Sequence, residues 1–211
     1  RNVYSFFTIY ANIDGFDPKA QSGRPVGERA LLDRWILSEL SRLTDSVTQL
    51  MDNYASYEAT RELSEFVEGL SNWWLRRSRD RFWSAGMDES KQDAYATLYE
   101  CLTTVIQLAA PFTPFQTEEL YQNLVVRPFG KDVPESVHLC DYPTADLSRV
   151  DRGLLEEMAM VRAIVSLGLR VRNDHKLKVR QPLSEASVVV ANEGLRARVA
   201  AYASLIADEL N

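Results

Sequence analysis

The chain has 211 residues, a mass of 24.0 kDa and a formal net charge of −6. Hydrophobic residues make up 45% of it and charged residues 26%, an ordinary globular composition that excludes a disordered or collagen-like chain. No apolar run approaches the roughly 20 residues that a membrane-spanning helix needs, and no signal peptide is visible. Because the chain opens on Arg1 and is apolar almost at once, we expect a piece of a longer polypeptide that works in the cytoplasm, away from membranes.

The two cysteines and two histidines of the sequence do not form a metal motif. Cys101 and Cys140 lie far apart without CxxC spacing, and His138 and His175 are not spaced as a pair of ligands. We expect no metal site and two buried, reduced thiols, with a disulfide between them as the alternative.

Helical periodicity dominates the chain and predicts a mainly α fold, a bundle of about five helices with short β pieces. The clearest apolar stripe steps by 4, 3, 4, 3 and 4 residues through Ile36, Leu40, Leu43, Val47, Leu50 and Tyr54. Thr113, Pro114 and Gln116 form a helix-start pattern, with a capping threonine, a proline in the first turn and a capping box. The expected helices cover about residues 3–13, 28–53, 57–83, 89–110, 114–126, 152–172 and 193–210.

Two short segments are predicted as strands. Residues 137–140 follow a proline-rich loop, and residues 186–191 (ASVVVA) are rich in β-branched side chains. A strand without a clear partner, followed by a last helix, predicts a small C-terminal α/β unit that is truncated after Asn211. The expected organisation is a connection over residues 1–27, a helical domain over 28–183 and the start of an α/β unit over 184–211.

Positive charge is concentrated in two islands of an otherwise acidic chain. Residues 76–81 (RRSRDR) carry a net +3 and residues 170–180 (RVRNDHKLKVR) a net +4, which leaves −13 for the remainder. Such a distribution favours local contact with a polyanion over general adhesion. The alternative is that these arginines lie on solvated helix faces or in ion pairs.

The sequence contains no catalytic constellation. The glycine loops GxGxxG and GxxxxGK are missing, as are GxSxG and HExxH. Acidic residues are frequent but stand mostly beside Lys or Arg, so nothing nominates a pair of catalytic carboxylates.

The strongest functional candidate is residues 71–83, SNWWLRRSRDRFW. Guanidinium groups bind phosphate in a bidentate manner, and aromatic rings stack on unpaired RNA bases. On an ideal helix Trp73, Arg77 and Arg81 share one stripe. Most of the aromatic residues of this segment are expected in the core. The predicted RNA-binding residues are Trp73, Arg76, Arg77, Arg79 and Arg81, with Lys176, Lys178 and Arg180 as a second group.

This segment closely resembles the corresponding sequence of the anticodon-binding domain of class I isoleucyl-tRNA synthetases. Four further pieces resemble the same domain in the same order, together covering about residues 1–185: DRWILSEL, LAAPFTPFQTEELYQNL, SVHLCDYP and KLKVRQPL. Valyl enzymes share the more general pieces and remain the alternative within the family, but the arginine-rich segment and KLKVRQPL favour isoleucine.

The resemblance implies that the chain holds the anticodon stem-loop of isoleucine tRNA as part of an isoleucine–tRNA ligase. The parent enzyme would use ATP and magnesium, would contact this region through its own catalytic domain, and is expected to be a monomer. HIGH-type and KMSKS-type motifs do not occur in this sequence, so no cofactor and no catalytic residue are expected here, and the isolated chain should be inactive. An acidic helical protein–protein interaction module is the alternative from another class.

Overall fold

The computed structural model describes residues 1–20, 22–178 and 181–210, and its chain divides into two compact units, Arg1–Val150 and Asp151–Asn211. The division falls near residue 150, whereas the sequence led us to expect a boundary at 183/184. Each unit is described by itself. No helix among the described residues is long and apolar enough to cross a membrane.

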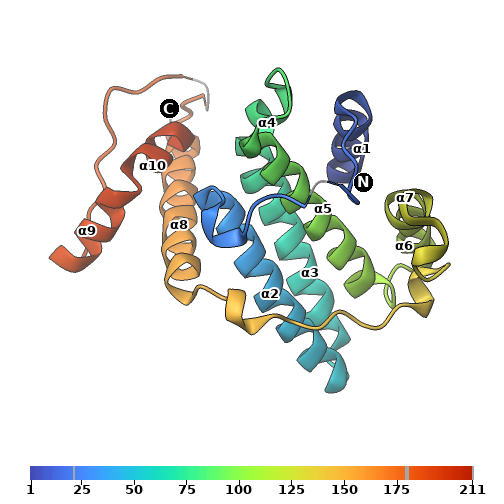
Figure 1. Ribbon diagram of the computed structural model, residues 1–211. Coiled ribbons are helices and arrows are strands. Elements are labelled where there is room, and N and C mark those ends of the chain that lie inside the picture. Colours follow the sequence, from blue (N-terminus) through green and yellow to red (C-terminus); the bar gives the residue numbers. More distant parts are fainter. Residues whose placement is uncertain (21, 179–180, 211) are drawn as a thin grey trace. The chain divides into compact units, whose positions relative to one another are not determined.

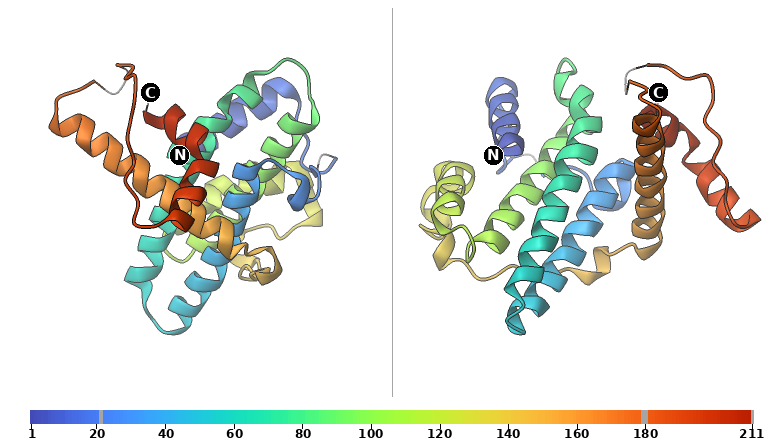
Figure 2. Two further views of the ribbon diagram at one scale, coloured as in Figure 1. Left: turned by 90° about the vertical axis from the view of Figure 1, so that its left-hand side faces the viewer. Right: turned by 180° about the vertical axis from the view of Figure 1, so that it is seen from behind.

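The first unit is a helical bundle in which α2 packs against α3 and α5 (Figure 1). Figure 2 shows α3, η2 and α4 running on as one continuous rod. The principal elements are α1 (Asn2–Asp14), α2 (Leu31–Asp52), α3 (Ser56–Gly69), the π-helical turn η2 (Leu70–Leu75), α4 (Arg76–Trp83), α5 (Glu89–Ala109), α6 (Pro114–Tyr121), the π-helical turn η3 (Gln122–Val126) and α7 (Arg127–Phe129). Short 3-10 turns are η1 (Val26–Glu28), η4 (Gly130–Asp132), η5 (Val137–Leu139) and η6 (Leu147–Arg149).

The apolar stripe of α2 forms the centre of the bundle, as its spacing predicted. Ile36, Leu40, Leu43 and Val47 are all buried against α3 and α5. The prediction fails only at its end, where Tyr54 is 94% exposed with a left-handed φ of 58°. The helix stops at Asp52, so the residue that would have continued the stripe lies in the turn before α3 instead.

Aromatic rings join α1 and α4 to α5. The rings of Phe16 and Tyr95 are stacked at 4.9 Å, and Phe82 meets Tyr95 edge-on at 4.8 Å. Phe6 of α1 also meets Phe82 edge-on, with the ring centroids 5.1 Å apart. Edge-to-face pairs of this kind are each worth about 0.5–1.5 kcal/mol beyond the area they bury.

Charged side chains are also buried around the first turns of α5. The fully buried Asp93 accepts hydrogen bonds from the Arg24 backbone and side chain at 2.7–2.9 Å. That pairing raises the pKa of the Arg24 guanidinium. Lys91, 2% exposed, donates to the Ser84 carbonyl at 3.0 Å and lies 2.7 Å from Asp14. These contacts attach the end of α1 and the loop before α2 to α5.

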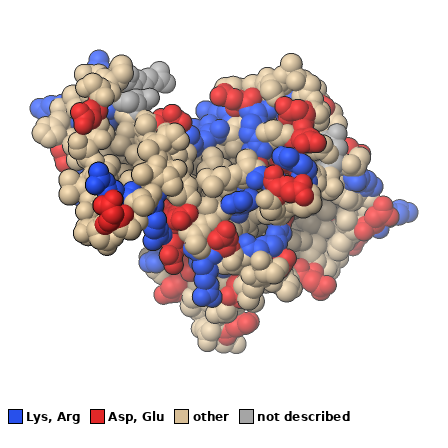
Figure 3. Space-filling model, turned by 60° about the vertical axis from the view of Figure 1, so that its left-hand side comes forward, with Lys and Arg blue, Asp and Glu red and all other residues tan. Residues whose placement is uncertain are grey.

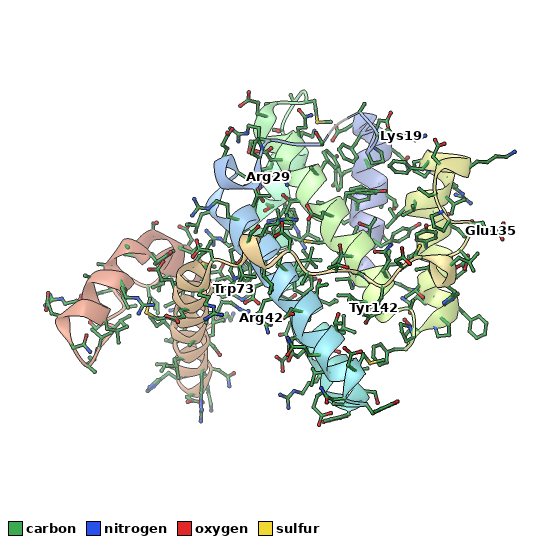
Figure 4. The ribbon with its side chains drawn as sticks, turned by 60° about the horizontal axis from the view of Figure 1, so that its bottom comes forward. Lys19, Arg29, Arg42, Trp73, Glu135 and Tyr142 are labelled. Atoms are coloured by element: carbon green, nitrogen blue, oxygen red, sulfur yellow. The ribbon has the colours of Figure 1, made fainter. Side chains whose placement is uncertain are left out.

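Arg29, labelled in Figure 4, completes this attachment from the loop before α2. Its guanidinium donates to Thr97 Oγ1 at 3.0 Å and to the Arg24 carbonyl at 2.7 Å. With 9% exposure it is a structural cation whose donors are satisfied largely by oxygens of the same loop and of α5.

The expected strand at residues 137–140 is wrong, because residues Val137–Leu139 form a 3-10 turn held by a carboxylate. Glu118 on α6 accepts from Ser136 Oγ at 2.8 Å and from the Val137 backbone at 3.0 Å. Burial disfavours the charged form of Glu118, but these hydrogen bonds stabilise the carboxylate more strongly, so the pKa of Glu118 is lowered. Thr113 precedes α6 as expected, although its hydroxyl donates to the Ala109 carbonyl and does not cap α6.

The second unit consists of α8 (Arg152–Asp174), α9 (Glu193–Ala201) and α10 (Ala203–Leu210). Asp151 caps α8 by accepting from the Leu154 backbone at 3.0 Å. The helix approaches α10 closely at Gly168, where an added Cβ would lie 2.6 Å from the Leu210 side chain. The expected single C-terminal helix is therefore two, separated at Tyr202.

The second expected strand, residues 186–191, is also wrong. This segment is irregular, with Val189 95% exposed, and the described residues contain no strand with which it could pair. A β-branched run needs a neighbouring strand for its backbone hydrogen bonds. The described part of this unit is therefore helical with loops, without the β component that we expected.

Both cysteines are free thiols, in agreement with the sequence analysis. Cys101 is fully buried, and burial together with the nearby charges of Glu100 and Asp33 raises its pKa well above the usual value. Cys140, expected in the core, is only half-buried and lies 3.2 Å from the Tyr121 hydroxyl.

Replacement of Leu40 by alanine tests the assigned core. Leu40 is 4% exposed, so Leu40→Ala should lower the free energy of unfolding by about 2–5 kcal/mol, because it removes buried apolar surface and leaves a cavity. Ile13→Ala is the matched control, since Ile13 is 72% exposed. Urea titration measures both, and a loss below about 0.5 kcal/mol for Leu40→Ala would contradict the packing described.

Candidate nucleic-acid interface

Residues 71–83 begin in the π-helical turn η2 and continue through α4, in the rod formed with α3. Five buried residues of this rod are spaced by four, namely Phe66, Leu70, Trp74, Ser78 and Phe82; Ala59, Leu63, Gly69 and Leu75 are also buried. Four residues of α-helix overshoot one turn by about 40°, so four such steps would carry the last of these residues roughly 160° from the first. The i→i+5 bonding of a π turn adds a residue per turn and removes part of that drift. The turn therefore keeps all five side chains on the face that meets the bundle.

The opposite face of the same segment is exposed and carries two of the predicted arginines. Asn72, Arg76, Arg79, Asp80 and Trp83 lie on it, and Trp83 is 54% exposed. The Arg76 Nε donates to the Asn72 carbonyl at 2.9 Å, which fixes the first part of that side chain. Arg79 has no hydrogen-bond or ion-pair partner within the described part of the chain. An indole ring beside two guanidinium groups can stack on a base while the cations bind phosphate.

Trp83 and Asn72 were not among the residues that we predicted for binding. We had expected most aromatic residues of this segment in the core, and Trp74 and Phe82 are indeed buried. The spacing of Trp83 from Arg76 and Arg79, seven and four residues, could have identified it as a member of the exposed stripe.

Arg81 does not lie on the exposed face. Its guanidinium forms a bidentate pair with Asp33 of α2, with both N–O distances 2.8 Å. It also donates to the Ser90 carbonyl and hydroxyl, at 2.6 Å and 3.0 Å for the nearest atoms. The side chain is 18% exposed and Asp33 is fully buried. The geometry therefore gives Arg81 a structural role and leaves it few donors for a phosphate.

Trp73 and Arg77 occupy the border between the two faces. Both are half-buried, and both interact with other residues of the chain. The Nε atom of Arg77 is buried, so part of this side chain is enclosed by the protein.

In the second unit, Lys176 and Lys178 are exposed in the loop that follows α8, and Lys176 has a left-handed φ of 57°. Arg180, the last residue of the predicted second group, lies outside the described residues. The loop is held by Arg172, which is 3% exposed. Its guanidinium donates to the carbonyls of Leu210 at 2.7 Å, Lys178 at 2.8 Å and Gln181. Arg172 thus contributes to the net charge of the basic island but serves to fix the loop.

Charge is mixed on the face of the molecule that Figure 3 shows. Figure 3 shows Lys and Arg interspersed with Asp and Glu on one face, without a large patch of a single sign. Within the described residues, no three His, Cys, Asp or Glu side chains are grouped so that they could hold a metal ion. Contact with a polyanion would therefore depend on individual arginines and lysines more than on a broad positive field.

Comparison with known proteins identifies the family. The family described as the anticodon-binding domain of tRNA ligase matches residues 33–189, which include both groups of predicted residues. The chain belongs to this family. An isoleucine–tRNA ligase of Dehalococcoides mccartyi is 48% identical to it over 210 residues, one of Clostridium novyi 46% and one of Chlamydia trachomatis 41%. Each alignment covers 100% of this chain and 20% of the relative, so the chain spans about a fifth of the length of these ligases.

Replacement of Arg81 separates its structural role from RNA contact. We expect Arg81→Ala to lower the free energy of unfolding by about 3–5 kcal/mol, because it leaves the buried Asp33 carboxylate without its counter-ion. Arg79→Ala, on the exposed face of the same helix, should change it by less than about 0.5 kcal/mol. Thermal and urea unfolding of both variants provide the measurement, and equal stability of the two would show that the pair with Asp33 contributes nothing.

Proposed function

We propose that this chain binds the anticodon stem-loop of isoleucine tRNA and is the corresponding region of an isoleucine–tRNA ligase. The observation that carries the proposal is the exposed stripe of η2 and α4, where Arg76, Arg79 and Trp83 lie together within the residues matched by the family. The relatives named above, 41–48% identical over the whole chain, support isoleucine as the amino acid.

The two arginines would bind backbone phosphates, and Trp83 would stack on an unpaired base of the loop. Bidentate guanidinium–phosphate contacts position RNA without reading its sequence, whereas stacking favours single-stranded nucleotides over the stem. Lys176 and Lys178 form a second phosphate-binding group, with Trp73 and Arg77 at the border of the first. Arg180 remains a prediction of the sequence.

The parent enzyme would attach isoleucine to the tRNA with ATP and magnesium, as a cytoplasmic monomer whose catalytic domain contacts this region. These features rest on the family resemblance and belong to the proposal. The interaction-module alternative is decided by the binding experiment below, because such a module would not bind a tRNA hairpin.

Combined replacement of Arg76 and Arg79 by alanine tests the binding surface. We expect at least a tenfold loss of affinity for an anticodon stem-loop hairpin of isoleucine tRNA, because a hydrogen bond to a charged group contributes about 1.5–3 kcal/mol. The dependence of log affinity on log salt should become shallower by about one to two, from a slope near −0.7 per phosphate contact. Fluorescence anisotropy at several salt concentrations measures both quantities.

The matched control removes two exposed cations from another part of the same unit. Arg127→Ala combined with Lys131→Ala changes the net charge equally, and both residues are exposed. If this control weakens binding as much as the Arg76 and Arg79 variant, only the overall charge matters and the stripe is not the site. Unchanged melting temperatures would show that neither variant acts through unfolding.

The isolated chain should not activate isoleucine. The sequence contains neither a HIGH-type nor a KMSKS-type motif, which the family uses to bind ATP. Isoleucine-dependent exchange of pyrophosphate into ATP should therefore remain at background, and exchange that rises with protein concentration would contradict this assignment.

A further inference from the structure

Asp33 lies in the first turn of α2, fully buried, and its carboxylate is shared by two residues of the RNA-binding segment. Oδ1 accepts from the Trp74 indole Nε1 at 2.8 Å and from Arg81 at 2.8 Å. Oδ2 accepts from the other terminal nitrogen of Arg81 at 2.8 Å. One side chain of α2 thus holds η2 through Trp74 and α4 through Arg81.

The two attachment points lie on either side of the junction between the π turn and the α-helix. They are seven residues apart, close to two turns, so one carboxylate can reach both. Arg76 and Arg79 stand between them on the opposite face. A segment held at two points along its axis cannot rotate about that axis without breaking a buried hydrogen bond.

The rotation of η2 and α4 about their axis determines which of their residues face solvent. If the rod reverted to uninterrupted α-helix, the residues after η2 would turn by up to about 100° for each residue of shift in phase. The arginines would then move toward the bundle, and part of the buried stripe would become exposed. Apolar packing alone tolerates alternative arrangements, whereas a buried polar group that must be paired admits few.

We propose that Asp33 is a positioning residue for RNA binding, which sets the rotation of η2 and α4 through Trp74 and Arg81 and so directs Arg76 and Arg79 outward. The inference rests on the proposed function. It adds a residue that is fully buried and 43 or more positions from the arginines it directs, and that makes no contact with RNA itself.

Two variants of the 211-residue chain weaken this arrangement to different extents. Asp33→Asn removes the charge and places amide hydrogens against Arg81. Trp74→Phe is milder, because it removes the indole donor and part of the buried ring system but keeps an aromatic ring and leaves the pair of Asp33 with Arg81 in place. Should Asp33→Asn fail to fold, Trp74→Phe decides the question. Val47→Ala, a buried change in the distant half of α2, is the control for general loss of stability.

Binding of the anticodon stem-loop hairpin is measured by anisotropy for each variant, alone and combined with Arg76→Ala and Arg79→Ala. We expect the folded positioning variant to lose roughly five- to tenfold in affinity when the arginines are present and less than twofold when they are absent. Val47→Ala should bind like the parent chain. Amide hydrogen exchange should increase in residues 70–83 for the positioning variant and not for the control.

Three results would overturn the inference, and they differ from failure of the proposed function. Parent-like affinity of folded Trp74→Phe would refute positioning while the arginines still matter. An equal loss with and without the arginines would also refute it, as would an equal loss in Val47→Ala. If the Arg76 and Arg79 variant itself binds like the parent chain, the proposed binding surface is wrong, and the role assigned to Asp33 falls with it.

Discussion

Five buried residues of the α3–α4 rod, from Phe66 to Phe82, are spaced by four, whereas an α-helix turns once in 3.6 residues. The mismatch is about 40° for one such step and about 160° for the four steps together. A π turn between Gly69 and Arg76 absorbs much of it, so that Phe66 at one end and Phe82 at the other both meet the bundle. The π turn therefore also sets the direction in which the side chains on the exposed face of the rod point.

Three ionic contacts, each with at least one buried partner, surround that rod and the beginning of α5. Asp33 pairs with Arg81, Lys91 with Asp14, and Asp93 with Arg24. A buried ion pair contributes little net stability relative to well-packed apolar side chains, but loss of one partner is strongly destabilising. These contacts join segments that packing alone would hold less specifically, namely the end of α1, the loop before α2 and the rod.

The helices of the bundle could be predicted from the sequence because their periodicity is local. The stripe of α2 could be identified from its own spacing. Asp88 and Asp151 stand directly before α5 and α8, and the carboxylate of each accepts a hydrogen bond from the backbone N–H three residues later. Strands are different, because a β-branched run specifies a strand only where another strand exists to pair with it. Residues 186–191 have no such neighbour among the described residues, and so the local preference was not realised.

The candidate site shows the same division between local and distant information. The sequence located the correct segment, since the composition of RRSRDR does not depend on the fold. It could not assign each arginine to a face, because it did not show that the stripe of Trp73, Arg77 and Arg81 lies half-buried at the border of the face that meets the bundle. The partner of Arg81 lies 48 residues away. Trp83 is exposed, although most of the aromatic residues of this segment were expected in the core.

The formal net charge of residues 76–81 is therefore larger than the positive charge that this segment has available for binding RNA. Of its four arginines, Arg81 is neutralised by Asp33, which reduces the net +3 of residues 76–81 to +2. In the second unit the guanidinium of Arg172 donates to backbone carbonyls and is likewise occupied within the protein. Arginine suits both uses, because its planar group of five donors can saturate a buried carboxylate or grip a phosphate. Which of the two it does is decided by whether an acceptor such as Asp33 has already been buried beside it.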